Sequence, residues 1–185
     1  AAPQGLSDRV LWVVLAILVL FRAVLLLRVA PIGDEAYYWL WSRHLDLCYF
    51  SKGPGVAWAI ALGTAACGDT VLGIRILSVL LSAGTAAGIA ILARRLFSAR
   101  VAFWALAVAA VAPMFLVGSV LMTIDPLSVF FWTLAANWFW TAKDSRSFLP
   151  WVLTGLAVGW AVARWAVFGV LGAAMRRRAI PVFHD

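Results

Sequence analysis

The feature that most constrains this chain is a series of long stretches without any charged residue. Residues 76–93 and 101–124 are 18 and 24 residues long, and neither stretch contains Asp, Glu, Lys or Arg. A helix that crosses a membrane needs roughly 20 mainly apolar residues, and such a helix satisfies its backbone polar groups internally. We therefore predict an all-α protein, a polytopic transmembrane helical bundle.

The composition supports this class and excludes others. Hydrophobic residues make up 65% of the 185 residues and charged residues 12%, whereas soluble domains average about 45–50% and about 25%. This composition excludes disorder, a coiled coil and an ordinary soluble enzyme. The net charge of +7 comes from basic residues between the apolar runs. That pattern is typical of loops that face anionic lipid, and it predicts no nucleic-acid partner.

The apolar runs and their breaks predict about five spans within one membrane domain, residues 1–185. The first run contains Arg22 and ends before a Pro-x-Gly break at residues 31–33. This run is too long for a signal-peptide core, so we predict a retained anchor. The expected spans are residues 9–30, 74–95, 101–119, 127–142 and 147–164, and the first outer loop is residues 31–73.

The basic loops predict the orientation of the bundle. Residues 94–100 contain three Arg and no acid, so the positive-inside rule places that loop and, by alternation, the N-terminus in the cytoplasm. Five of the eight acids then gather outside, namely Asp34, Glu35, Asp46, Asp69 and Asp125. The three Arg at 176–178 break this alternation, which a chain that stops partway through a larger membrane protein would explain.

Two interfacial juxtamembrane helices are expected in the outer loop. The first is amphipathic, with an apolar face opposed to a polar one: Tyr38, Trp41, Leu45 and Cys48 against Glu35, Ser42 and Asp46. The second, residues 53–68, carries no charge and lies at the surface or packs on the bundle. A true span at residues 53–68 would reverse the orientation of everything downstream.

Each ionisable residue near the outer face also has a structural explanation. Asp34 and Glu35 suit the cap and first turn of a helix, and Asp125, which precedes a proline, suits a helix start. Lys52 can extend its ammonium to the interface. Arg22 can do the same or pair with an acid, although ionisable residues inside spans are functional candidates.

Metal motifs are absent from the sequence. Cys48 and Cys67 lack the spacing of metal ligands. The chain also contains no HExxH, no CxxC and no Gly-rich phosphate loop. We therefore predict no cofactor and no metal from motifs.

Five sequence segments occur in an order that resembles a known family: DEAYYWLWSRHL, YFSKGPGVAW, GIRILSVL, ARRLFSAR and TIDPLSVFF. Over residues 8–163 the chain resembles the polytopic GT-C glycosyltransferases that use lipid-phosphate sugars. The nearest group is the bacterial relatives of protein O-mannosyltransferases and of the aminoarabinose transferase for lipid A. Members of that family are several times longer, so the resemblance implies that this is an N-terminal part that is inactive alone.

The resemblance assigns roles to matching positions. Asp34 matches the first acid of an outer-loop Asp-Glu motif and would be the catalytic base, with Glu35 as its partner, and Asp125 matches an acid near the same site. Lys52 matches a Lys that contacts the donor phosphate. Tyr49 matches an aromatic position of the family. Arg164 loosely matches the basic residue of a basic-aromatic pair, about two residues out of register, and would bind substrate.

Two positions depart from the family pattern. The aminoarabinose branch has an acid before this Lys that helps to hold a metal, and Ser51 stands there. A zinc site is therefore in doubt, although a divalent metal stays possible. The usual Lys-Pro-Pro is Lys-Gly-Pro, residues 52–54.

The resemblance implies a membrane glycosyltransferase that moves a sugar from a polyprenyl-phosphate donor to an acceptor hydroxyl of a protein, lipid or glycan. The expected location is a bacterial inner membrane with the site on the outer face. The residue types suit this chemistry, since a carboxylate can remove the acceptor proton and a cation can stabilise the leaving phosphate. The alternatives are a transporter segment with Arg22, Asp125 and Arg164 along a pathway, or a non-catalytic membrane scaffold.

Overall fold

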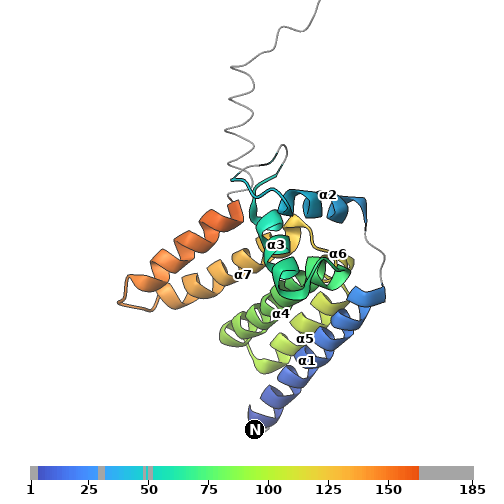
Figure 1. The fold of residues 1–185 in the computed structure, drawn as a ribbon. Helices are drawn as coiled ribbons and strands as arrows, with labels where there is room; N and C mark the ends of the chain where they lie inside the picture. Colours follow the sequence, from blue (N-terminus) through green and yellow to red (C-terminus); the bar gives the residue numbers. More distant parts are fainter. Residues whose placement is uncertain (1–3, 29–31, 48, 50–51, 163–185) are drawn as a thin grey trace, which may run out of the picture.

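The computed structural model describes residues 4–28, 32–47, 49 and 52–162. All regular structure in this part of the chain is helical (Figure 1), so the predicted all-α class is confirmed there. The helices are α1 (Gln4–Arg28), α2 (Gly33–Ser42), α3 (Gly55–Cys67), α4 (Val71–Leu96), α5 (Ala99–Val111), α6 (Pro113–Gly118), α7 (Ile124–Ala142) and the unlabelled helix Leu149–Val162.

Helix α4 is the centre of the bundle and contacts α1, α3, α5 and α7 (Figure 1). Among the described residues, α4 is the one helix that is long and apolar enough to cross a membrane by length and composition. The prediction of about five spans is therefore not confirmed. Many large apolar side chains on the outer faces of the bundle are exposed, as lipid-facing side chains are.

Helix α3 packs on the bundle rather than lying apart at its surface, which decides between the two expectations for residues 53–68. Val56, Ala57 and Ile60 of this helix are buried. The contact with α4 is very close: a Cβ on Gly63 would lie 2.2 Å from the carbonyl oxygen of Gly73. Only glycine permits that approach between the two backbones.

The segment predicted as a span at residues 101–119 is not one helix, because the structure divides it into α5 and α6. Ala112 between them has φ −65° and ψ 121°, an extended conformation. Pro113 follows, and a proline disfavours helical geometry at the preceding residue and lacks the N–H that would continue the helix.

The predicted amphipathic pattern of α2 is correct on one face only. Tyr38 and Trp41 are buried, as expected of the apolar face. Glu35 and Ser42, which were assigned to the polar face, are buried as well, so these polar residues pack against the protein. Asp34, Tyr37 and Leu40 form the exposed side of α2. Leu45 lies beyond the end of the helix and is exposed.

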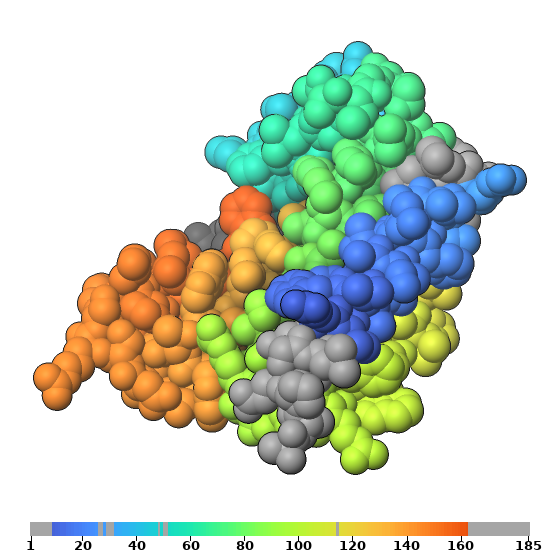
Figure 2. Space-filling view, turned by 90° about the horizontal axis from the view of Figure 1, so that it is seen from below, coloured from blue at the N-terminus to red at the C-terminus, as the bar shows by residue number. Residues whose placement is uncertain are grey.

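Seen from below, α1 (blue) crosses one face of the bundle, and α7 with the helix Leu149–Val162 (orange) forms a lobe beside it (Figure 2). The α2–α3 segment caps the end of the bundle at which α1 ends and α4 begins (Figure 1). Residues that approach one another at this capped end therefore come from α2, from the beginning of α4 and from the beginning of α7.

Candidate functional site

A buried ion pair fixes α2 to the central helix. The Nε of Arg75 donates a hydrogen bond to Oε1 of Glu35 at 2.7 Å, and its Nη2 donates to Oε2. Relative exposure is 0% for Arg75 and 1% for Glu35. A guanidinium and a carboxylate that meet through two bonds form one of the strongest pairings available to side chains.

The same carboxylate also binds two backbone groups. Oε1 of Glu35 accepts from the N–H of Met122 at 3.0 Å, and Oε2 accepts from the N–H of Ile32 at 3.3 Å. The second contact satisfies the backbone N–H of Ile32, the N-cap residue of α2. Glu35 thus joins α2, α4 and the turn that leads into α7.

A hydroxyl group fixes that turn from the other side. Ser78 of α4 is buried, and its Oγ lies 3.0 Å from the carbonyl oxygen of Gly118 and 2.9 Å from that of Leu121. The turn before α7 is therefore held to α4 directly by Ser78 and, through Glu35, by Arg75. Asp125, in the first turn of α7, takes its position from this turn.

The negative charges of Asp34 and Asp125 both act on the phenol of Tyr38. Asp34 follows the cap residue of α2 by two positions and is exposed, whereas Asp125 is half-buried. Burial raises the pKa of Tyr38 above its ordinary value, and the negative charges of Asp34 and Asp125 raise it further, with a contribution from Tyr37. The structure thus brings the two predicted catalytic acids within electrostatic reach of the same side chain.

The loop that carries Lys52 is organised by Tyr49. The Tyr49 ring stacks on Trp41 with centroids 4.6 Å apart, and its hydroxyl accepts from the N–H of Asp46 at 3.1 Å. The same hydroxyl lies 2.9 Å from the carbonyl oxygen of His44, and the N–H of Tyr49 donates to the carbonyl of Lys52. These contacts make Tyr49 a support of the loop that presents the half-buried Lys52.

An apolar groove, which we call the Lys52 groove, begins next to that lysine. One part is lined by Gly53, Pro54 and the first turn of α7. A second part runs between α3, α4 and α7. The two parts adjoin, because they share four lining residues, namely Gly55, Trp58, Leu127 and Trp160.

Metal ligands are not assembled in the part of the chain that the structure describes, where no group of three or more His, Cys, Asp or Glu side chains could hold an ion. Arg164, predicted to bind substrate, lies outside the described residues.

Sequence reasoning missed Arg75. It stands in the first turns of α4, just before 18 residues without a charge, and a charge at such a place requires a partner. The need for a partner was the one signal in the sequence that could have identified Arg75. That partner, Glu35, is 40 residues away in the sequence, and helical periodicity does not indicate such distant pairs.

Comparison with known proteins gives a family and a set of relatives. The family model for dolichyl-phosphate-mannose-protein mannosyltransferase matches residues 51–176. A lipid A galacturonosyltransferase of Rhizobium johnstonii is 33% identical over 151 residues, which are 80% of this chain and 32% of the relative. An undecaprenyl phosphate-alpha-4-amino-4-deoxy-L-arabinose arabinosyl transferase of Pseudomonas aeruginosa is 35% identical over 126 residues, 65% of this chain and 23% of the relative.

The chain therefore spans about a third or less of the length of these curated relatives. No solved structure matches it significantly. These relatives are glycosyltransferases of the kind that the sequence motifs indicated. The family match includes Lys52, the residues that line the Lys52 groove and the first turn of α7.

Proposed function

The chain belongs to the dolichyl-phosphate-mannose-protein mannosyltransferase family, and from this premise we propose that it is part of a membrane glycosyltransferase that uses a polyprenyl-phosphate sugar. The observation that carries the proposal is that the charges of Asp34 and Asp125 both act on Tyr38 of α2, and that the Lys52 groove begins at the same first turn of α7 that carries Asp125. A base, a second acid, a cation and an apolar channel are the parts that such a reaction needs.

Asp34 is the proposed general base. An exposed carboxylate can take the proton of an acceptor hydroxyl as its oxygen attacks the anomeric carbon of the donor. The new carbon–oxygen bond forms as the bond from that carbon to the phosphate oxygen breaks. The electron pair leaves with the phosphate, whose charge the ammonium of Lys52 stabilises.

The polyprenyl chain of the donor occupies the Lys52 groove in this proposal. Its lining is mainly apolar and aromatic, including Trp58 and Trp160 with ring centroids 6.3 Å apart. Burial of hydrocarbon in such a channel is favourable, and a phosphate at the head of the chain then lies next to Lys52.

Glu35 has a supporting role in this proposal. Its carboxylate already accepts from Arg75, Met122 and Ile32, so it positions Asp34 and the start of α7 instead of reacting. Asp125, whose charge acts on the same phenol as that of Asp34, is proposed to contact the substrate.

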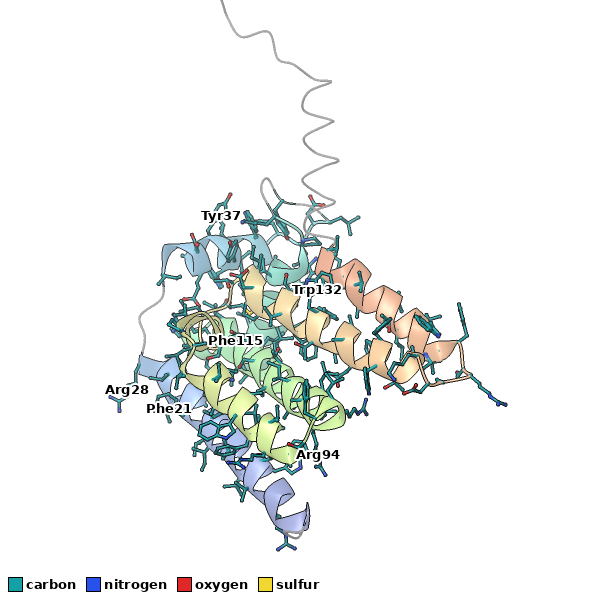
Figure 3. The ribbon with its side chains drawn as sticks, turned by 180° about the vertical axis from the view of Figure 1, so that it is seen from behind. Phe21, Arg28, Tyr37, Arg94, Phe115 and Trp132 are labelled. Atoms are coloured by element: carbon teal, nitrogen blue, oxygen red, sulfur yellow. The ribbon has the colours of Figure 1, made fainter. Side chains whose placement is uncertain are left out.

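We also propose that this site is on the outer face and that the N-terminus is cytoplasmic. Arg94 lies at the opposite end of the bundle from Tyr37 of α2 (Figure 3). Arg95 and Arg100 belong to the same basic segment. The positive-inside rule places this basic end in the cytoplasm, which leaves α2 and Asp34 outside.

The test is transfer of sugar by the full-length parent protein in membranes, from a panel of polyprenyl-phosphate sugars. Asp34→Asn is compared with Asp46→Asn, since both acids are exposed and lie in the same outer segment. We expect Asp34→Asn to lower the rate by about 10²–10⁴-fold at unchanged expression, and Asp46→Asn to leave it unaltered. Equal rates for Asp34→Asn and wild type would reduce Asp34 to a helix-capping role. Absence of transfer from every donor by wild type would refute the glycosyltransferase proposal.

A further inference from the structure

A second cavity lies at the start of α7, apart from the Lys52 groove. It is walled by α1, α4, α5, α6 and α7. We call it the Arg22 cavity, after the one residue that α1 contributes to it. None of its lining residues also lines the Lys52 groove. A ligand of this cavity is therefore a different molecule from the donor whose chain is proposed for the Lys52 groove.

Arg22 is the unusual member of this wall. Its relative exposure is 4%. Within the residues that the structure describes, its guanidinium makes no hydrogen bond and no ion pair. A buried charge is costly unless it is paired, and an arginine cannot escape that cost by losing its proton. The cavity thus presents a buried cation that calls for an anionic group.

The other polar groups of the cavity accept hydrogen bonds. Asp125 adds a carboxylate from α7. A carboxylate offers about four lone-pair sites, so Asp125 can accept from a ligand as well as from the groups that it already meets. The hydroxyls of Ser82, Thr85 and Ser119 lie 2.7–2.9 Å from carbonyl oxygens of their own segments, so their protons are used and their lone pairs can accept. A matching ligand therefore carries an anion for Arg22 and a cationic N–H group for this acceptor wall.

An apolar groove, which we call the α4–α7 groove, adjoins this cavity. It is lined by side chains of α4 and α7, including the exposed Trp132, and by Phe97 just after α4. Ile89 and Val129 line both the groove and the cavity, so the two spaces meet there. From Ile89 the groove follows α4 toward the end of the bundle that carries Arg94, opposite to α2 (Figure 3). With α2 on the outer face, as proposed above, a hydrocarbon chain in this groove points from the outer side into the membrane.

We propose that the Arg22 cavity and the α4–α7 groove together bind one membrane phospholipid, whose head group is phosphoethanolamine. Its phosphodiester meets the guanidinium of Arg22 through two bonds. Its ammonium has three N–H donors, which bind the carboxylate of Asp125 and the neighbouring hydroxyls. One acyl chain lies in the groove, where its burial is favourable.

The charges of the cavity favour this head group over the other common ones. A glycerol head group supplies the phosphate for Arg22 but brings no cation to Asp125. A choline head group brings a cation that has no N–H to donate. The lipid is a bound partner and is not consumed, so this inference does not depend on the proposed sugar transfer.

The experiment is thermal unfolding of the delipidated full-length protein in detergent, titrated with phosphatidylethanolamine, phosphatidylglycerol or phosphatidylcholine. A ligand that binds the folded state raises Tm as its concentration increases, and the titration gives an apparent affinity. We expect phosphatidylethanolamine to stabilise wild type at the lowest concentration. Arg22→Met should lower that affinity by about 10–100-fold, because hydrogen bonds to a charged partner are lost. Arg22→Lys should keep part of the affinity. The control Arg28→Met, which changes an exposed arginine of the same helix, should keep all of it.

Two further readouts separate lipid binding from a purely structural role. Without lipid, Arg22→Met should unfold at a higher temperature than wild type, because it removes a buried charge that has no partner. With phosphatidylethanolamine, the advantage of Arg22→Met should shrink or reverse. Asp125→Asn should reduce the preference for phosphatidylethanolamine over phosphatidylcholine.

Three results would overturn the inference. Equal affinity of wild type and Arg22→Met for phosphatidylethanolamine would place the lipid elsewhere. Tighter binding of phosphatidylglycerol or phosphatidylcholine by wild type would exclude the phosphoethanolamine head group. A lower Tm for Arg22→Met without lipid would show that another segment of the full-length chain pairs with Arg22. None of these results bears on sugar transfer, and a failure of the transfer assay leaves this lipid site intact.

Discussion

The ion pair between Glu35 and Arg75 makes a quantitative prediction about stability. Glu35→Gln preserves the shape of the side chain but leaves the guanidinium of Arg75, at 0% exposure, without its charged partner. Removal of one member of a buried pair costs about 3–5 kcal/mol. The amide oxygen of glutamine can still accept from the N–H of Met122, so we expect the lower end, about 3 kcal/mol.

The measurement is thermal unfolding in detergent, followed by the fluorescence of the 11 tryptophans. At about 2–4 °C per kcal/mol for a chain of this size, Glu35→Gln lowers Tm by about 6–12 °C. The control is Arg43→Gln, which breaks the ion pair with Asp69 whose side chains are 49% and 46% exposed. Exposed pairs contribute about 0–1 kcal/mol, so that shift stays below about 4 °C.

A double-mutant cycle isolates the pair itself. Arg75→Gln alone leaves the Glu35 carboxylate buried without its cation, while the combined Gln/Gln variant leaves no buried charge at this place. We therefore expect the double variant to be less destabilised than the sum of the two single variants, by about 2–3 kcal/mol. Additive effects, or a shift for Glu35→Gln no larger than that for Arg43→Gln, would refute the view that this pair fixes α2 to α4.

Three further predictions concern other parts of the chain. A Cβ on Gly73 would lie 2.2 Å from the carbonyl oxygen of Gly68, so Gly73→Ala should lower the free energy of unfolding by about 1–3 kcal/mol. Gly159 has open space around it, so Gly159→Ala should raise the free energy of unfolding by about 0.5–1 kcal/mol. Chemical unfolding measures both changes. The raised pKa of Tyr38 means that the folded state keeps the phenolic proton to higher pH than the unfolded state. Stability should therefore fall as the pH rises above the ordinary tyrosine pKa, and Tyr38→Phe should reduce that fall in unfolding measured across alkaline pH. Lys52→Gln should raise KM for the lipid donor by about 10–100-fold through loss of a charged contact, and an unchanged KM would remove Lys52 from the phosphate site.

The helices follow from local sequence, which is why most of them could be predicted. The charge-free run within 74–95 predicts a helix, and α4 covers Val71–Leu96. The break at Pro113 was also readable, since the restriction that proline places on Ala112 is local. The expected span did not include this break, because the absence of charge over residues 101–124 was given more weight than the proline.

The pairing of Glu35 with Arg75 was beyond such reasoning. Helical spacing puts Glu35 on the same face as Ser42, and that face was assigned to solvent because it is polar. Whether a polar face meets water or a buried cation depends on which helix packs against it. Only the tertiary arrangement brings Arg75 to that face.

Adjacent residues on a helix are about 100° apart, since a turn contains 3.6 residues, and this explains the different environments of Asp34 and Glu35. When Glu35 turns inward to Arg75, Asp34 is directed away from that contact and stays exposed. An acid that must meet a substrate needs access to it, and it also needs a fixed backbone. The buried neighbour supplies the fixed backbone through three elements at once, since it contacts α4, the turn before α7 and the cap of α2. In the proposed reaction the Asp-Glu pair is therefore one unit, in which Glu35 holds the backbone from which Asp34 would remove the acceptor proton.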